Sequence, residues 1–240
     1  MKWIRANKVD AMNQPQALVL QRPPKAVQLI LLFHGVGSDA QSMTALGQAY
    51  ARAFPEAMVV AVDAPYASEL APGGWQWFSV LGVTEENRPE RVATALPAFE
   101  YAVRHWQRQS EVDAAGTALV GFSQGAIMAL EAALRPEPVA ARVVAIGGRF
   151  ARLPELPLHE GSSIHLLHGK ADAVMPYRHA IEAAYRLRSL GADFTADVLP
   201  LIGHELHPDL MAQAVDKLQH HIPARLWIQP GEEDTGKESA

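Results

Sequence analysis

Short apolar runs alternate along the chain with longer stretches in which apolar positions recur every three or four residues. The alternation extends from about Val27 to about Gln219 and indicates strands followed by helices, the order of a mostly parallel sheet. Most of the runs are almost continuously apolar, as is typical of strands that helices cover on both faces. We expect the strands at Val27–Phe33, Ala57–Val62, Thr117–Phe122, Arg142–Ile146, Ser163–His168 and Asp193–Leu199, with an edge strand at Ala17–Gln21.

The stretches between these runs have helical periodicity. In the longest of them, Val92, Leu96 and Phe99 recur at the spacing of one helix face. Pro89 suits a first helical turn, whereas Pro97, inside the same stretch, predicts a kink or an interruption. The expected helices are about Gln41–Ala53, Pro89–Gln109, Gln124–Leu134, Tyr177–Leu190 and Pro208–His220.

Two segments depart from the alternation. The connection Ala64–Asn87 is long, contains several prolines and glycines, and carries a cluster of aromatic residues. Long loops in compact domains are usually functional. The last residues are polar and lack apolar periodicity, which is typical of a flexible segment. We therefore expect one α/β domain over residues 1–222 and a flexible C-terminal tail over residues 223–240.

Composition narrows the range of functions. The balance of 49% hydrophobic and 20% charged residues is that of a globular protein, and a net charge of −5 provides no basic field to attract nucleic acid. The absence of cysteine excludes disulfides, thiolate nucleophiles and Cys-ligated zinc. The apolar runs are too short to cross a bilayer, and Met1–Asp10 does not lead into a signal peptide. We expect a cytoplasmic protein without a membrane span.

The segment Gly121-Phe122-Ser123-Gln124-Gly125 matches the pattern G-x-S-x-G. It follows a predicted strand and precedes a predicted helix, which is the context in which this pattern forms a nucleophile elbow. A sharp turn of this kind presents the serine hydroxyl above the sheet, and the glycines allow neighbouring backbone to come close. Ser123 is therefore the candidate nucleophile.

A serine hydroxyl at its ordinary pKa is a weak nucleophile, so a base and an orienting acid are needed. In this fold class they follow the serine in the order acid, then histidine. Asp172 comes just after the strand Ser163–His168, and His204 follows the strand Asp193–Leu199. Because sites in such sheets lie at the carboxyl ends of the strands, we expect Ser123, Asp172 and His204 to meet.

Other residues compete for these roles. His207 is the alternative base. Asp197 lies within a predicted strand and Asp209 at the start of a predicted helix, so structural or solvated positions suit both acids better. His34 and His168 each precede a glycine at a strand end, where we expect them to shape loops.

Acyl transfer also requires donors for a developing oxyanion. The backbone N–H after the nucleophile, that of Gln124, supplies one donor, and the loop after an earlier strand supplies the second. The strand Val27–Phe33 runs into a glycine-rich turn, in which Val36 is the expected donor and Gly37 the alternative.

Three other functions compete with this interpretation. The turn Gly35–Ala40 also fits the dinucleotide pattern G-x-G-x-x-G/A, with Asp63 near the place of a ribose-binding acid. His204 and His207 are one residue short of H-E-x-x-H spacing, which argues against a zinc site. An inactive binding module with the same residues is the third alternative. We expect neither a cofactor nor a metal.

Five segments in order resemble the carboxylesterase/phospholipase family of α/β-hydrolases, which includes acyl-protein thioesterases. The resemblance covers about residues 25–222 and implies Ser123, Asp172 and His204 as the triad. It also implies that Trp77 and Phe78 border an acyl pocket, although packing in the core is an alternative for both. The segments are Leu32–Gly37, Trp75–Ser79, Gly121–Ala126, His168–Asp172 and Gly203-His204. Met175 departs from the family, which often has another apolar residue there.

We therefore expect an α/β-hydrolase fold with a mostly parallel central sheet, helices on both faces and no large lid domain. The expected activity is that of a serine carboxylesterase acting on small esters with short-to-medium acyl chains. An acyl-protein thioesterase or a lysophospholipase with the same triad is the alternative. The sequence is compatible with a monomer or a homodimer.

Overall fold

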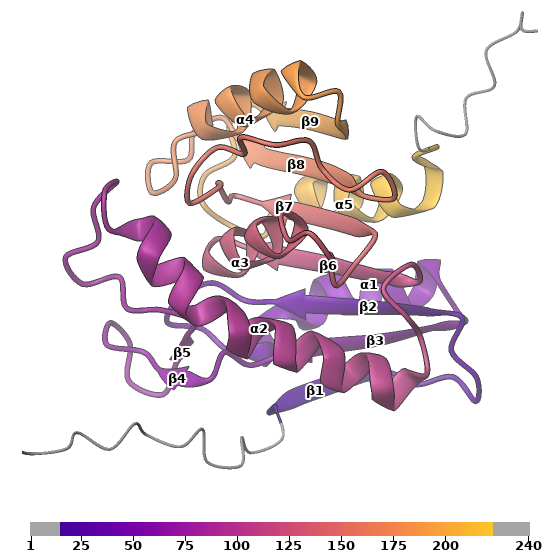
Figure 1. Ribbon diagram of the computed structural model, residues 1–240. Coiled ribbons are helices and arrows are strands. Elements are labelled where there is room, and N and C mark those ends of the chain that lie inside the picture. The colour runs from indigo at the N-terminus through magenta and orange to yellow at the C-terminus, as the bar shows by residue number, and fades with distance from the viewer. Residues whose placement is uncertain (1–14, 223–240) are drawn as a thin grey trace, which may run out of the picture.

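A seven-stranded sheet forms the centre of the computed structural model, which describes residues 15–222 (Figure 1). The order across the sheet is β1, β3, β2, β6, β7, β8 and β9, and within it β1 pairs antiparallel with β3 while the other pairs are parallel. The predicted α/β class is confirmed. The strands are β1 (Ala17–Gln21), β2 (Gln28–Phe33), β3 (Ala57–Val62), β6 (Thr117–Phe122), β7 (Arg142–Ile146), β8 (Ser163–Gly169) and β9 (Asp193–Leu199). The predicted tail, residues 223–240, and the segment Met1–Asp10 lie outside the described residues.

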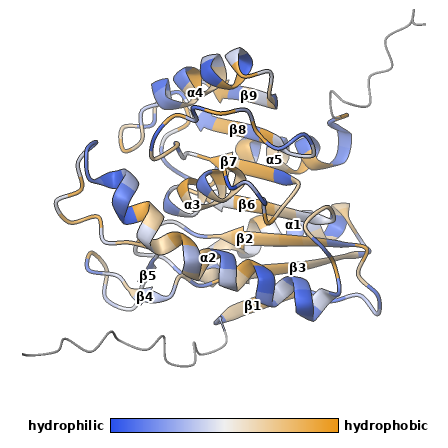
Figure 2. Cartoon of the chain, in the orientation of Figure 1, coloured by the Kyte–Doolittle hydropathy of each residue, from blue (hydrophilic) through white to orange (hydrophobic). Residues whose placement is uncertain are grey.

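Strand β2 shows why the sequence reads as continuously apolar. Successive side chains of a strand point to opposite faces of the sheet. Leu29 and Leu31 pack into the cluster on one face, and Ile30 and Leu32 pack into the cluster on the other, all 2% exposed or less. Figure 2 shows the resulting hydrophobic colour along the central strands. Each such side chain contributes about 1.5–3 kcal/mol by leaving water.

Helices cover both faces of this sheet, as predicted. α1 (Thr44–Ala53), which follows a 3-10 turn at Ala40–Met43, packs against α5 (Pro208–His220), and their buried residues share one core cluster. α2 (Arg88–Ser110), α3 (Gln124–Ala133) and α4 (Arg178–Ser189) contribute to the cluster on the opposite face.

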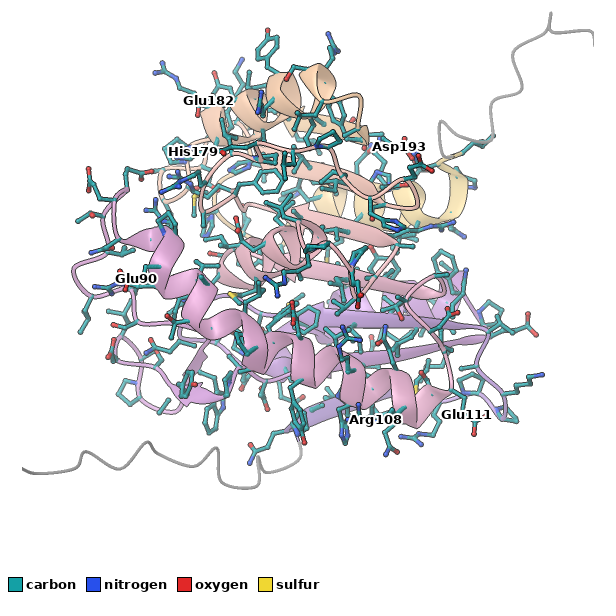
Figure 3. All side chains as sticks on the ribbon, viewed as in Figure 1. Glu90, Arg108, Glu111, His179, Glu182 and Asp193 are labelled. Atoms are coloured by element: carbon teal, nitrogen blue, oxygen red, sulfur yellow. The ribbon has the colours of Figure 1, made fainter. Side chains whose placement is uncertain are left out.

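The long helix α2 is not interrupted at Pro97, so that part of the prediction is wrong. Pro97 lies on the exposed side, where water can solvate the carbonyl group that lost its donor, while Leu96 and Phe99 stay buried. Figure 3 shows charged side chains at both ends of this helix, Glu90 near its start and Arg108 near its end.

The connection between β3 and α2 contains an antiparallel ribbon that the sequence did not predict, β4 (Tyr66–Ala67) and β5 (Trp75–Gln76). Two hydrogen bonds tie this ribbon to the turn after β2. The Gly37 N–H donates to the Trp75 carbonyl (2.9 Å), and the Trp75 N–H donates to the Ser38 carbonyl (2.8 Å). The connection is therefore anchored beside the carboxyl end of β2.

Parallel pairing brings the ends of β2 and β6 together, with Phe33 opposite Gly121. The turns that follow β2, β6, β8 and β9 consequently open at one edge of the sheet. In residues 15–222, no helix has both the length and the hydropathy that crossing a bilayer requires.

Candidate active site

Ser123 occupies a strained turn between β6 and α3. Its backbone has φ 52° and ψ −114°, and the residue is 8% exposed. A Cβ at Gly121 would lie 2.4 Å from the nitrogen of Ala126, and a Cβ at Gly125 would lie 2.2 Å from the carbonyl oxygen of Phe33. Both distances are far below contact, so this turn requires glycine on each side of the serine.

The structure brings Ser123, His204 and Asp172 together in a chain of hydrogen bonds. His204 Nε2 lies 2.9 Å from the Ser123 Oγ, and His204 Nδ1 lies 2.7 Å from Asp172 Oδ2. The Asp172 side chain is 1% exposed, whereas the His204 side chain is 15% exposed. The histidine thus connects a buried carboxylate to a hydroxyl at the edge of the sheet.

The carboxylate of Asp172 is fixed on both oxygens. Its Oδ1 accepts the backbone N–H groups of Val174 (2.9 Å) and Met175 (2.7 Å). His168 Nε2 lies 2.6 Å from the Met175 carbonyl oxygen and 3.3 Å from Asp172 Oδ2. Burial lowers the pKa of His168. The neutral ring therefore holds the loop of the acid through the N–H that it donates to Met175, the loop-shaping role expected from its place at the strand end.

Two backbone amides beside Ser123 have no hydrogen-bond acceptor within residues 15–222, those of Val36 and Gln124. The Gln124 N–H belongs to the first turn of α3, where amides lack an intrahelical partner. The Gly37 amide donates to Trp75, so the alternative donor is occupied. A Cβ at Gly35 would lie 3.1 Å from the Cβ of Ser123, which places the Val36 turn directly against Ser123.

The side chain of Gln124 has a function that the sequence did not indicate. Its Oε1 accepts the backbone N–H of Trp77 and its Nε2 donates to the backbone carbonyl of Phe78, both at 2.8 Å. The Trp77 ring is 1% exposed and contacts the rings of Phe33 and Phe99 edge-on. Trp77 and Phe78 are thus packed in the core and also line a cavity of about 700 Å³. Only the general G-x-S-x-G pattern pointed to Gln124.

The residues that compete with the triad or support other functions contact groups other than Ser123. His207 caps α5 by accepting the backbone N–H of Asp209. Asp197 pairs with Lys217 at 2.9 Å. Asp63 accepts the Ala40 N–H at 2.6 Å, inside the turn that the dinucleotide pattern described. Within the described part of the chain, no group of three or more His, Asp or Glu side chains is arranged to hold a metal ion.

An ion pair joins the connection before α2 to the turn after β7. The Arg149 guanidinium donates to both oxygens of Glu85 (2.9 and 2.7 Å), and Arg88 donates to the same carboxylate. The hydrogen bonds from Arg149 and then Arg88 lower the pKa of Glu85 to about 2. Arg149 also contacts His179 at the start of α4, which Figure 3 labels. This turn borders the site, because a Cβ at Gly147 would lie 3.4 Å from His204 Nδ1.

Comparison with known proteins agrees with this geometry. Residues 14–222 match the model of the phospholipase/carboxylesterase family. Esterase YpfH of Escherichia coli (strain K12) is 45% identical over 224 residues, which is 90% of this chain and 95% of that protein. Acyl-protein thioesterase 1 of Neurospora crassa is 22% identical over 86% of this chain and 95% of that protein. The crystal structure of esterase PE8 superposes with a TM-score of 0.76 at 31% identity, over 86% of this chain and 97% of that one.

The family match spans most of the chain, and it agrees with the resemblance that the motifs indicated. A dinucleotide-binding dehydrogenase is not supported, because the turn that suggested it is part of the hydrolase fold. The chain belongs to the phospholipase/carboxylesterase family of α/β-hydrolases and is a carboxylic ester hydrolase.

Proposed function

We propose that the protein is a serine carboxylesterase with Ser123 as nucleophile, His204 as general base and Asp172 as the orienting acid. The observation that carries the proposal is the continuous chain of hydrogen bonds from Ser123 Oγ through both nitrogens of His204 to Asp172. The three residues come from the turns after β6, β8 and β9, and we therefore propose a single domain.

Acylation begins when His204 Nε2 takes the proton of Ser123 as Oγ attacks the ester carbonyl carbon. The new C–O bond moves the carbonyl electron pair onto oxygen, and the amides of Val36 and Gln124 donate to this oxyanion. When the carbonyl reforms, the bond to the alcohol breaks and His204 gives its proton to the departing oxygen. The enzyme then carries the acyl group on Ser123.

Deacylation repeats these steps with water. His204 removes a proton from the water as its oxygen attacks the acyl carbon, and the same two amides bind the oxyanion. The bond to Ser123 Oγ breaks, the serine recovers its proton, and the carboxylic acid leaves. Asp172 accepts the N–H of His204 Nδ1 throughout, which holds the tautomer and stabilises the imidazolium.

The proposed substrates are small esters with short-to-medium acyl chains. The connection between Ala64 and Asn87 is the main element beyond the α/β core near the site. Trp77 and Phe78 in it line the 700 Å³ cavity, and the Gln124 side chain holds their backbone next to Ser123, although the triad itself does not line that cavity. Thioesters are the second candidate, because the same machinery attacks them and the chain resembles an acyl-protein thioesterase. Matched series of p-nitrophenyl esters and acyl thioesters of increasing length distinguish the two. A preference for long chains contradicts the proposed size limit.

A fluorophosphonate probe tests the nucleophile directly, because an activated serine reacts rapidly with it. We expect labelling of the wild-type protein and none of Ser123→Ala. The matched control is Ser162→Ala, which removes a buried hydroxyl at the amino end of β8 and retains labelling and turnover. A folded Ser123→Ala protein with a near-wild-type rate would refute the assignment. A cytoplasmic location and the oligomeric state stay predictions, for cell fractionation and light scattering to test.

A further inference from the structure

Asp63, directly after β3, carries a carboxylate that the proposed mechanism does not use. Within residues 15–222, no Lys or Arg lies within 4.0 Å of it, and His34 is the one base at that distance, with its Nε2 3.9 Å from Oδ1. Burial lowers the pKa of His34, and its Nε2 accepts the Ala64 N–H while Nδ1 donates to the Gly35 carbonyl. The histidine is therefore neutral, and no cation in the described part of the chain compensates Asp63.

This carboxylate lines a cavity of about 570 Å³ between the end of β3, the β4–β5 ribbon and α2. Aromatic side chains from these elements form much of its wall, namely Tyr66, Trp75, Trp77 and Tyr101. Neither Lys nor Arg is among the described residues that line it, and the triad is not among them. The cavity is thus acidic and aromatic, and it lies apart from the nucleophile.

The walls of this cavity offer unused binding groups. Within residues 15–222, the rings of Tyr66, Trp75 and Tyr101 contact no other aromatic ring. The indole N–H of Trp77 is buried and has no acceptor among the described residues, although buried indole groups usually find one. That N–H is closed off from the cavity, so a ligand can use aromatic surface and one negative charge.

We propose that this cavity binds a small organic cation, with the chemistry of an alkyl or quaternary ammonium group. The ammonium group lies between the aromatic rings and the free oxygen of Asp63, where cation–π and Coulomb attraction act together. An inorganic cation leaves the aromatic walls unfilled, and an anion is repelled by Asp63.

The cavity is connected to the turn that carries the Val36 amide. Asp63 Oδ1 accepts the Ala40 N–H at one end of this turn, and the backbone of Trp75 exchanges hydrogen bonds with Gly37 and Ser38 in its middle. Because a ligand at Asp63 and Trp75 touches groups that hold this turn, we expect addition of choline to change kcat for ester hydrolysis. This second consequence rests on the proposed function, whereas the binding itself does not.

Calorimetric titration with choline and with 3,3-dimethylbutan-1-ol, a neutral molecule of the same shape, tests the proposal. We expect choline to bind about tenfold more tightly or better, because only choline carries the charge. Asp63→Asn keeps an oxygen acceptor for Ala40 and should lower choline affinity toward that of the alcohol, which the substitution should leave unchanged. Asp113→Asn is the matched control, because Asp113 also accepts a backbone N–H, that of Gly116 (3.0 Å), but does not line the cavity.

A second variant protects the test against misfolding of the first. Tyr101→Leu changes a half-buried side chain of α2 and should weaken choline binding several-fold while the alcohol is unaffected. Equal affinities for the two probes, or choline binding that Asp63→Asn leaves unchanged, overturn the inference. An active esterase that ignores choline contradicts only this inference, and an inactive protein that binds choline contradicts only the proposed function.

Discussion

Replacing Gln124 with leucine tests how the nucleophile turn is coupled to the aromatic segment beside it. The change leaves the backbone amide of residue 124 in place. It removes the two hydrogen bonds of the side chain, one from the backbone N–H of Trp77 and one to the backbone carbonyl of Phe78. Each buried group left without a partner costs about 1–3 kcal/mol, so the two together cost about 2–6 kcal/mol. Burial of the apolar leucine offsets about 1–2 kcal/mol of this.

We therefore expect the free energy of unfolding to fall by up to about 5 kcal/mol, measured by urea denaturation. Because the segment of Trp77 and Phe78 loses its anchor to α3, we also expect kcat/KM to fall, and to fall most for the longest acyl chain that the enzyme accepts. The urea measurement reports any loss of stability, and the chain-length dependence of kcat/KM reports displacement of the segment of Trp77 and Phe78.

Gln107→Leu is the matched control for this variant. Gln107 donates to Thr117 Oγ1 (3.0 Å) and to the Val139 carbonyl (2.7 Å), at the amino end of β6 and away from Ser123. This substitution should cost stability and leave kcat/KM within about twofold, since additive effects are expected for distant sites. A Gln124→Leu protein with wild-type stability and wild-type chain-length dependence refutes the reasoning.

Four further predictions follow from the geometry. Gly125→Ala forces a Cβ to within 2.2 Å of the Phe33 carbonyl oxygen, so we expect a loss of about 3 kcal/mol or more in thermal unfolding together with lost fluorophosphonate labelling; unchanged labelling contradicts the model of the turn. Asp172→Asn should lower kcat about 10³–10⁴-fold with the fold intact, measured with p-nitrophenyl acetate. Glu85, whose pKa falls from 4.5 to about 2 in the fold, adds stability that is fully present above pH 4.5 and is lost as the pH falls through 2. Its side chain is 63% exposed, so Glu85→Gln should cost under about 1 kcal/mol at pH 7 and clearly less at pH 2, measured by urea denaturation. Burial lowers the pKa of His165 from 6.5 to about 3, so as the pH drops the unfolded chain takes up this proton before the folded protein does. The free energy of unfolding should therefore fall between pH 6.5 and pH 3. His165→Asn should make this fall less steep in urea denaturation at several pH values, and an equal dependence on pH in both proteins would argue against the assignment.

The sequence predicted the turn between strand and helix at Ser123 because its determinants are local. Gly121, Ser123 and Gly125 lie within five residues, and the apolar strand before them and the helix after them are visible in the same stretch. Asp172 and His204 could be predicted because parallel strands bring their carboxyl ends to one edge, so position after a strand is enough to place both residues.

Contacts between distant segments could not be predicted in the same way. The Gln124 side chain reaches Trp77, 47 residues away, and no pattern near either residue indicates the pairing. The β4–β5 ribbon has strands of two residues each, too short for an alternating pattern. Pro97 predicted a kink or an interruption, and the sequence alone does not show that the proline lies on the exposed side of a helix that continues through it. Tertiary packing decides each of these features.

The pairing of β2 with β6 sets the separation of the two donors in the candidate oxyanion hole. Phe33 lies opposite Gly121, and the two candidate donors, Val36 and Gln124, each follow their paired residue by three positions. The spacing of neighbouring strands, about 4.8 Å, therefore sets the separation from which the two turns begin. An insertion of one residue in either turn would therefore displace one donor relative to the other. We therefore expect the lengths of these two turns to vary far less among relatives than the length of the connection Ala64–Asn87, even where Ser123, Asp172 and His204 are all retained.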